Sequence, residues 1–187
     1  MKHFILLLAL ILSSYGYAQE LPFLFKGKVS NSDNNVPEGA VKVSIEQNGL
    51  VVSNVQTISN GKYTLRGTVD LSMPFQVTFA KTDFVSKFVQ FDMTKMNEED
   101  APSGDLRPVD QLDIRIFKER ENLDFGFLDE EPVVEFEWNP SRMSAIPDMN
   151  GANKMKSRIE DMLLEEERNK VATDTKYNQA ILEADAA

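Results

Sequence analysis

Two Asn-Gly pairs, Asn48-Gly49 and Asn60-Gly61, are separated by ten residues of mixed apolar and polar character. A two-residue turn of type I′ requires φ > 0 at both central positions, which Asn tolerates and Gly adopts without a steric penalty. Turns of this type join adjacent antiparallel strands. The two pairs therefore predict a three-strand meander, and they indicate a turn rather than a chemical role for either Asn.

Apolar and polar residues alternate with a period of two in several short segments between Leu21 and Lys118. The regular segments are 23–29, 41–46, 62–66, 75–79 and 112–116, and the less regular ones are 50–59 and 84–91. Because successive side chains of a strand point to opposite faces, this pattern marks half-buried strands. About seven short strands separated by turn residues are typical of an antiparallel β-sandwich. The polar segment 94–109 is expected to be a loop between the sixth and seventh strands.

The first 18 residues have the pattern of a secretory signal peptide. Lys2 supplies a positive charge, residues 4–12 are an unbroken apolar run, and the segment ends in Gly16-Tyr17-Ala18. That order is typical of a signal peptide cleaved after Ala18. The apolar run is shorter than the roughly 20 residues that span a bilayer. We therefore expect an exported mature chain, residues 19–187, without a transmembrane segment.

The mature chain would contain neither histidine nor cysteine, because His3 is the single histidine and the sequence has no cysteine. Such a chain cannot build a Ser-His-Asp triad, a Cys-His pair or a His/Cys zinc site. We expect no catalytic residue, no cofactor and no metal site. Oxygen ligands for calcium are an alternative at residues 31–35 and at Asp105, Asp110 and Asp113, although Asn and Asp are also ordinary turn residues.

Negative charge is concentrated in the second part of the chain. The formal net charge is −10, and residues 119–187 hold 17 acidic and 8 basic side chains. Residues 119–137 alone hold eight acidic side chains and one basic one, Arg120. An acidic chain without a basic stripe argues against nucleic acid and anionic lipid surfaces as partners. The acidic stretch is either a solvated face or a surface for a basic partner.

Short motifs spread over residues 22–118 point to one family. The matching residues are Gly27, Val29, Pro37, Gly39, Ala40, Val43, Thr57, Gly61, Tyr63, Leu65, Phe79, Phe84 and Lys87. On these residues the segment resembles the carboxypeptidase regulatory-like domain, a seven-strand, transthyretin-like Greek-key β-sandwich frequent in exported Bacteroidota proteins. Asp83 stands where that family usually has Gly, and Ile58 where it has an acidic residue. The resemblance implies an accessory domain that performs no chemistry and is attached to peptidases, receptors or periplasmic assembly factors.

Residues 119–148 form an acidic, aromatic-rich arm that the resemblance does not cover. The run VVEFEW at residues 133–138 fits either an additional edge strand or an arm lying across the sandwich. Phe136 is expected to cover the core, and Trp138 is expected to be an exposed anchor. Both are candidate partner-binding residues.

Residues 149–187 are expected to form a helical tail. Met155, Ile159, Met162 and Leu163 lie at helical spacing and form a short apolar stripe. An isolated helix of this kind is marginal in water, so the stripe should dock on its own sandwich or on another chain. We therefore treat these four residues as candidate partner-binding residues. Residues 173–175 are expected to interrupt the helix before a second, weak helix at 176–184.

The sequence therefore predicts a sandwich at residues 19–118, an arm at 119–148 and a helical tail at 149–187. We expect the sandwich to fold without the rest, and the partner-binding residues to lie in 119–187. The predicted function is that of a non-catalytic accessory or scaffold protein, in the periplasm or at the outer membrane. Its partner would be a protein, such as a component of an outer-membrane secretion or nutrient-uptake machine. The alternative is a module that binds glycan or peptidoglycan.

Overall fold

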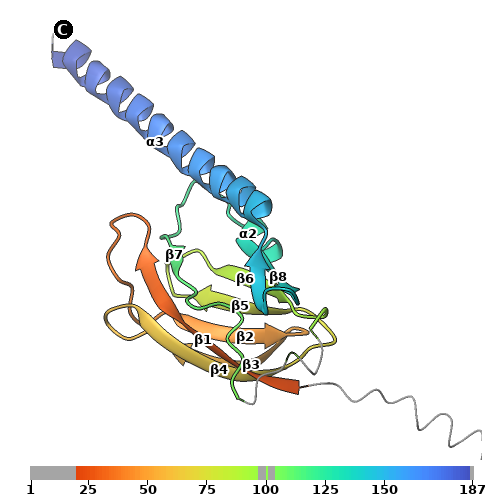
Figure 1. Cartoon of the computed structure of the whole chain (residues 1–187). Coiled ribbons are helices and arrows are strands. Elements are labelled where there is room, and N and C mark those ends of the chain that lie inside the picture. Colours follow the sequence, from red (N-terminus) through yellow and green to blue (C-terminus); the bar gives the residue numbers. More distant parts are fainter. Residues whose placement is uncertain (1–19, 97–99, 101–103, 186–187) are drawn as a thin grey trace, which may run out of the picture.

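The computed structural model describes residues 20–96, 100 and 104–185, and the predicted signal peptide at residues 1–18 lies outside this range. Within the described residues, two sheets pack face to face (Figure 1). The first sheet has the strand order β4 (Lys62–Asp70), β1 (Glu20–Asn31) and β7 (Ile114–Ile116). The second has the order β3 (Leu50–Gln56), β2 (Lys42–Gln47), β5 (Phe75–Ala80), β6 (Lys87–Asp92), β8 (Val134–Asn139) and β9 (Ser144–Pro147).

The predicted mainly β sandwich followed by a helix is confirmed, and the structure changes two of its details. The sheets are mixed rather than purely antiparallel, because β7 runs parallel to β1 and β8 runs parallel to β6. Long connections lead into both strands, and these can return the chain in the same direction, as a tight hairpin cannot. The arm also contributes two strands, so the described part of the sandwich exceeds the predicted seven.

The first Asn-Gly pair forms the predicted hairpin. Asn48 and Gly49 have φ angles of 52° and 73°, as a type I′ turn requires, and they join β2 to β3. The structure thus confirms the predicted turn at this pair.

The second Asn-Gly pair does not complete a meander, and that prediction was wrong. Only Gly61 has a positive φ, 75°, and its N–H donates to the carbonyl of Ile58 at 2.8 Å. Val29 of β1 donates to the carbonyl of Gly61 at 2.9 Å, so the turn rests on the other sheet. The chain therefore crosses from β3 in one sheet to β4 in the other.

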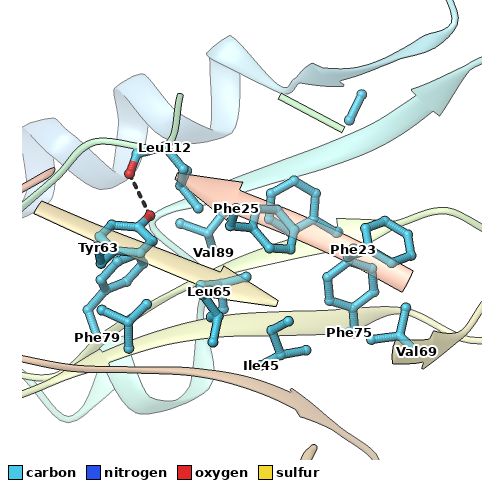
Figure 2. Packing of buried hydrophobic residues seen from close by; sticks show 14 of the residues in the cluster. Phe23, Phe25, Ile45, Tyr63, Leu65, Val69, Phe75, Phe79, Val89 and Leu112 are labelled. Atoms are coloured by element: carbon cyan, nitrogen blue, oxygen red, sulfur yellow. Dashed lines mark hydrogen bonds between the residues drawn. The ribbon is translucent and has the colours of Figure 1, made fainter. Parts of the chain in front are cut away.

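Aromatic side chains from both sheets meet in the core (Figure 2). Phe23 and Phe25 of β1 face Phe75 of β5, with the Phe23–Phe75 ring centroids 5.1 Å apart. The ring of Phe25 also lies 5.0 Å from that of Phe91 in β6. All four side chains are at most 2% exposed. Burial of each contributes about 1.5–3 kcal/mol, and this cluster therefore accounts for a large part of the attraction between the sheets.

The segment that leads to β7 is fixed against β1 by close backbone contacts. The buried hydroxyl of Tyr63 donates to the carbonyl of Leu112 at 2.7 Å, the bond drawn as a dashed line in Figure 2. The N–H of Leu112 donates to the carbonyl of Lys26 at 2.9 Å. A Cβ at Gly27 would lie 2.0 Å from the Leu112 oxygen, so this approach requires glycine.

The predicted arm is largely part of the sandwich. The run VVEFEW proves to be mostly strand: β8 pairs with β6, and β9 pairs antiparallel with β8. The rings of Phe91 and Phe136 stack across β6 and β8 at 4.9 Å. The predicted boundary after Lys118 therefore does not coincide with the end of the sheet.

The helical tail is one continuous helix, and the predicted interruption at residues 173–175 is wrong. A short helix, α2 (Phe127–Glu130), precedes β8, and α3 (Met149–Asp185) follows β9. The hydroxyls of Thr173 and Thr175 donate to carbonyls four residues earlier, at 2.9 Å and 2.8 Å. These bonds let threonine remain within a helix despite its low helical propensity.

The two turn glycines provide a first test. We expect Gly49→Ala to cost only backbone strain, roughly 1 kcal/mol, because nothing lies within 4 Å of the new Cβ. Gly61→Ala adds a collision, since its Cβ would lie 2.2 Å from the carbonyl oxygen of Val29. Thermal unfolding followed by circular dichroism should show a fall of about 2–4 °C for Gly49→Ala and at least twice that for Gly61→Ala. Equal losses would contradict the crossing turn.

A pair of shortened chains tests the boundary of the sandwich. A chain of residues 19–118 lacks β8 and β9 and so uncovers the ring of Phe91 and the edge of β6. Contrary to the expectation from the sequence that residues 19–118 fold alone, we expect this chain to aggregate or to unfold without cooperativity. A chain of residues 19–148 keeps all strands and should unfold in one transition in urea. Cooperative unfolding of the shorter chain would show that β8 is dispensable.

Candidate interaction surface

The base of α3 is docked on its own chain. Met155 is buried in a small second core with Phe117, Phe125 and Leu128. The other three residues of the predicted stripe, Ile159, Met162 and Leu163, are partly buried against the same cluster. The sequence left open whether this stripe docks on its own chain or on another chain. In the structure it packs against residues of its own chain.

Two arginines fasten α3 to the body. The guanidinium of Arg158 lies 3.7 Å from the ring centroid of Phe127 and 3.0 Å from a carboxylate oxygen of Glu131. Arg120, on the segment before α2, forms ion pairs with Asp33 at 2.9 Å and with Glu166 of α3 at 3.6 Å. These groups are partly exposed, so each pair contributes little stability and mainly fixes the direction of the helix.

Trp138 is not the exposed anchor that the sequence predicts. Its side chain is 2% exposed and belongs to the main core, with its indole nitrogen 3.4 Å from a carboxylate oxygen of Asp100. Phe136 is half-buried and packs on that core, as expected of a covering residue. The alternation in VVEFEW places both on the inner face of β8, so packing accounts for both aromatics.

The outer part of α3 has no cover in the described structure. From Glu167 to Lys176 every residue is exposed. The helix has 37 residues, which corresponds to a length of about 55 Å. Figure 1 shows it projecting away from the sandwich beyond its docked base. A long, polar, uncovered helix is marginally stable alone and presents a large surface to a partner.

A basic face that no sequence pattern indicates lies on the outer side of the first sheet. Lys26 and Lys28 of β1 lie beside Lys62 of β4, and the register places Lys28 directly opposite Lys62. None of these three forms an ion pair with a carboxylate in the described part of the chain. They line a hollow of about 500 Å³ whose apolar wall is Val55 and Ile58.

No local pattern indicates this face, because its lysines come from two strands with 30 residues between them in the chain. The expectation that the protein has no basic stripe holds along the sequence but is wrong on the folded surface. The alternation that marks the core residues also marks the lysines as outward-facing on β1. Only the pairing of β1 with β4 brings Lys62 beside them.

Lys87 and Tyr63 are buried titratable residues whose contacts stabilise the packing of the sandwich. Lys87 is 6% exposed, and its ammonium group donates to the carbonyl of Arg115 at 2.9 Å and lies 4.2 Å from the ring centroid of Phe117. Its burial lowers the pKa of Lys87 to about 8. Burial, together with the nearby carboxylate of Asp113, raises the pKa of Tyr63 well above its ordinary value. Tyr63 is therefore a neutral hydrogen-bond donor.

The first oxygen-rich segment proposed for calcium, residues 31–35, acts as a turn. The side-chain oxygens of Asn31 and Asn34 accept from the N–H groups of Asp33 and Val36, both at 2.9 Å. Among the described residues there is no group of three or more His, Cys, Asp or Glu side chains arranged to hold a metal ion. The same residues include no helix long and apolar enough to cross a membrane.

Comparison with known proteins gives little further information. No protein-family model matches the chain, and no curated protein sequence matches it. Among solved structures, 3-chlorocatechol 1,2-dioxygenase from Rhodococcus opacus 1CP aligns with it at 14% sequence identity and a TM-score of 0.39. The alignment covers 55% of this chain and 62% of the dioxygenase chain. A likeness at this level carries no argument about fold or activity.

The buried lysine predicts a defined pH dependence of stability. The folded-state pKa of Lys87 lies below its ordinary value, so the unfolded chain binds more protons between the two pKa values. Its contribution to the free energy of unfolding therefore rises with pH, by about 1 kcal/mol between pH 7 and pH 9. Urea unfolding should show this rise in the native chain and not in Lys87→Met. Parallel pH profiles for the two proteins would refute the assignment.

Proposed function

We propose that the protein is an exported, non-catalytic scaffold of the cell envelope that binds a protein partner through α3. The observation that carries this proposal is the uncovered outer part of that helix, which follows a firmly docked base. The sandwich serves as a rigid mount, and the contacts of Met155, Arg158 and Arg120 set the direction in which the helix leaves it.

Export is part of the proposal and rests on the signal-peptide pattern of residues 1–18. The resemblance of residues 22–118 to the carboxypeptidase regulatory-like domain supports an accessory role in the periplasm or at the outer membrane. It also suggests a secretion or nutrient-uptake machine as the class of partner. The lack of His and Cys in the mature chain supports a role without catalysis.

The alternative function, binding of glycan or peptidoglycan, has less support. Aromatic platforms bind sugar rings, and the single tryptophan of the chain, Trp138, is buried and cannot serve as one. A scaffold that binds protein is therefore the better supported of the two.

Capture from envelope extracts tests the proposed function. Residues 19–187 and residues 19–166 are immobilised as separate baits, and the shorter bait keeps the docked base of α3 up to Glu166. We expect the longer bait to recover a specific envelope protein and the shorter one to recover at least about tenfold less, because the outer helix supplies the contact. The recovered protein is identified by mass spectrometry, and its binding is measured again with purified components.

A matched control uses the full-length bait with Lys42→Glu, which alters an exposed charge on the second sheet. This variant should recover the partner normally. Equal recovery by the 19–166 bait would refute the role of α3. Retention of the shorter chain on peptidoglycan, without a protein partner, would favour the glycan-binding alternative.

A further inference from the structure

The clustered positive charges of the basic hollow reduce the stability of the folded protein. Like charges directly opposite each other on paired strands are destabilising, and Lys28 faces Lys62 in this way. Lys26 adds a third positive charge to the same hollow. The protein as a whole has a net charge of −10, so this cluster is also opposite in sign to the rest of the molecule. The carboxylate of Asp113, which accepts a hydrogen bond from the backbone N–H of Lys28 at 2.7 Å, offsets part of this repulsion, and an anionic occupant would relieve the rest.

The exposed stripe of α3 has the complementary composition. Glu160, Leu164, Glu167 and Val171 follow the spacing i, i+4, i+7, i+11, which places them along one side of the helix. Leu164 and Val171 are 49% and 60% exposed, although both are apolar. Glu160 and Glu167 are exposed as well. The stripe also borders a hollow of about 650 Å³ beside Arg120, so a second surface can approach it.

We propose that the exposed stripe of α3 in one copy of this chain docks in the basic hollow of a second copy. Glu160 and Glu167 would meet the lysines, and Leu164 would lie against the apolar wall formed by Val55 and Ile58. The hollow combines positive charge with exposed apolar surface, since Ile58 is 60% exposed. The stripe combines negative charge with exposed apolar surface, so the two match in both respects.

The occupant must come from another copy. Figure 1 shows α3 leaving the body next to α2 and β8, away from β4, which lines the hollow together with β1 and β3. The docked base of the helix prevents it from turning back to its own first sheet. The contact joins two different surfaces, so it is heterologous and can add copies head to tail. Because much of the attraction is between exposed charges, the association should weaken with salt.

This inference rests on the proposed role of α3 as a binding element, and it is tested with the purified chain alone. The hollow variant carries Lys26→Glu and Lys62→Glu, and the stripe variant carries Glu160→Lys and Glu167→Lys. Analytical ultracentrifugation should show a weight-average mass that rises with concentration for residues 19–187 and falls in about 0.5 M salt. Each variant alone should stay monomeric. An equimolar mixture should associate again, because the native stripe meets the native lysines and the Lys-bearing stripe meets the Glu-bearing hollow, so both contacts are complementary.

Two control variants carry the same charge changes elsewhere. Lys42→Glu with Lys118→Glu leaves the hollow intact, and Asp161→Lys with Glu165→Lys alters the same helix away from the stripe. Both should associate like the native chain. A native chain that stays monomeric at all concentrations, or a mixture of the hollow and stripe variants that does not associate, overturns the inference. Capture of an envelope protein by α3 in that case would leave the proposed function intact and assign the stripe to that partner.

Discussion

The structure depends on a stack of phenylalanine rings that crosses three strands of the larger sheet. Phe75 and Phe91 stack at 5.3 Å with an interplanar angle of 10°, and Phe91 and Phe136 stack at 4.9 Å with an angle of 8°. The last of these rings belongs to β8, so the stack joins the sandwich to the segment that leads into α3. Phe25 of the opposite sheet packs on the same stack. The sandwich and the mount of the helix are therefore one packed unit.

The sequence was informative wherever a local rule decides the conformation. Asn48-Gly49 demands a tight hairpin, and the alternation of Phe75, Val77 and Phe79 demands a half-buried strand; both are present. The Asn60-Gly61 pair predicts a turn from its local sequence, but tertiary contact with Val29 decides which strands the turn joins. The parallel pairing of β8 with β6 likewise depends on a long return of the chain that no local pattern records.

The candidate surfaces also divide into features that local sequence predicts and features that depend on tertiary contacts. The apolar stripe around Met155 was recognised from its helical spacing, but the sequence could not say which surface it covers. Trp138 was misplaced because a tryptophan beside Asn139-Pro140 suggests exposure, although its position on the inner face of β8 buries it. Lys28 and Lys62 become neighbours only through strand register. Residues on one element can thus be grouped from sequence, whereas residues from separate elements require the fold.

The docking of the base of α3 explains how its outer part can be helical and still be exposed for binding a partner. Nucleation is the costly step in forming a helix, and propagation adds residues at nearly no free-energy cost. Burial of Met155 and the ion pairs of Arg158 and Arg120 order the helix as far as Glu166 and so supply the nucleus. The turns beyond Glu166 then extend from an existing helix without needing contacts of their own. A partner that binds there has little ordering entropy to overcome, so even a modest contact area can yield measurable affinity.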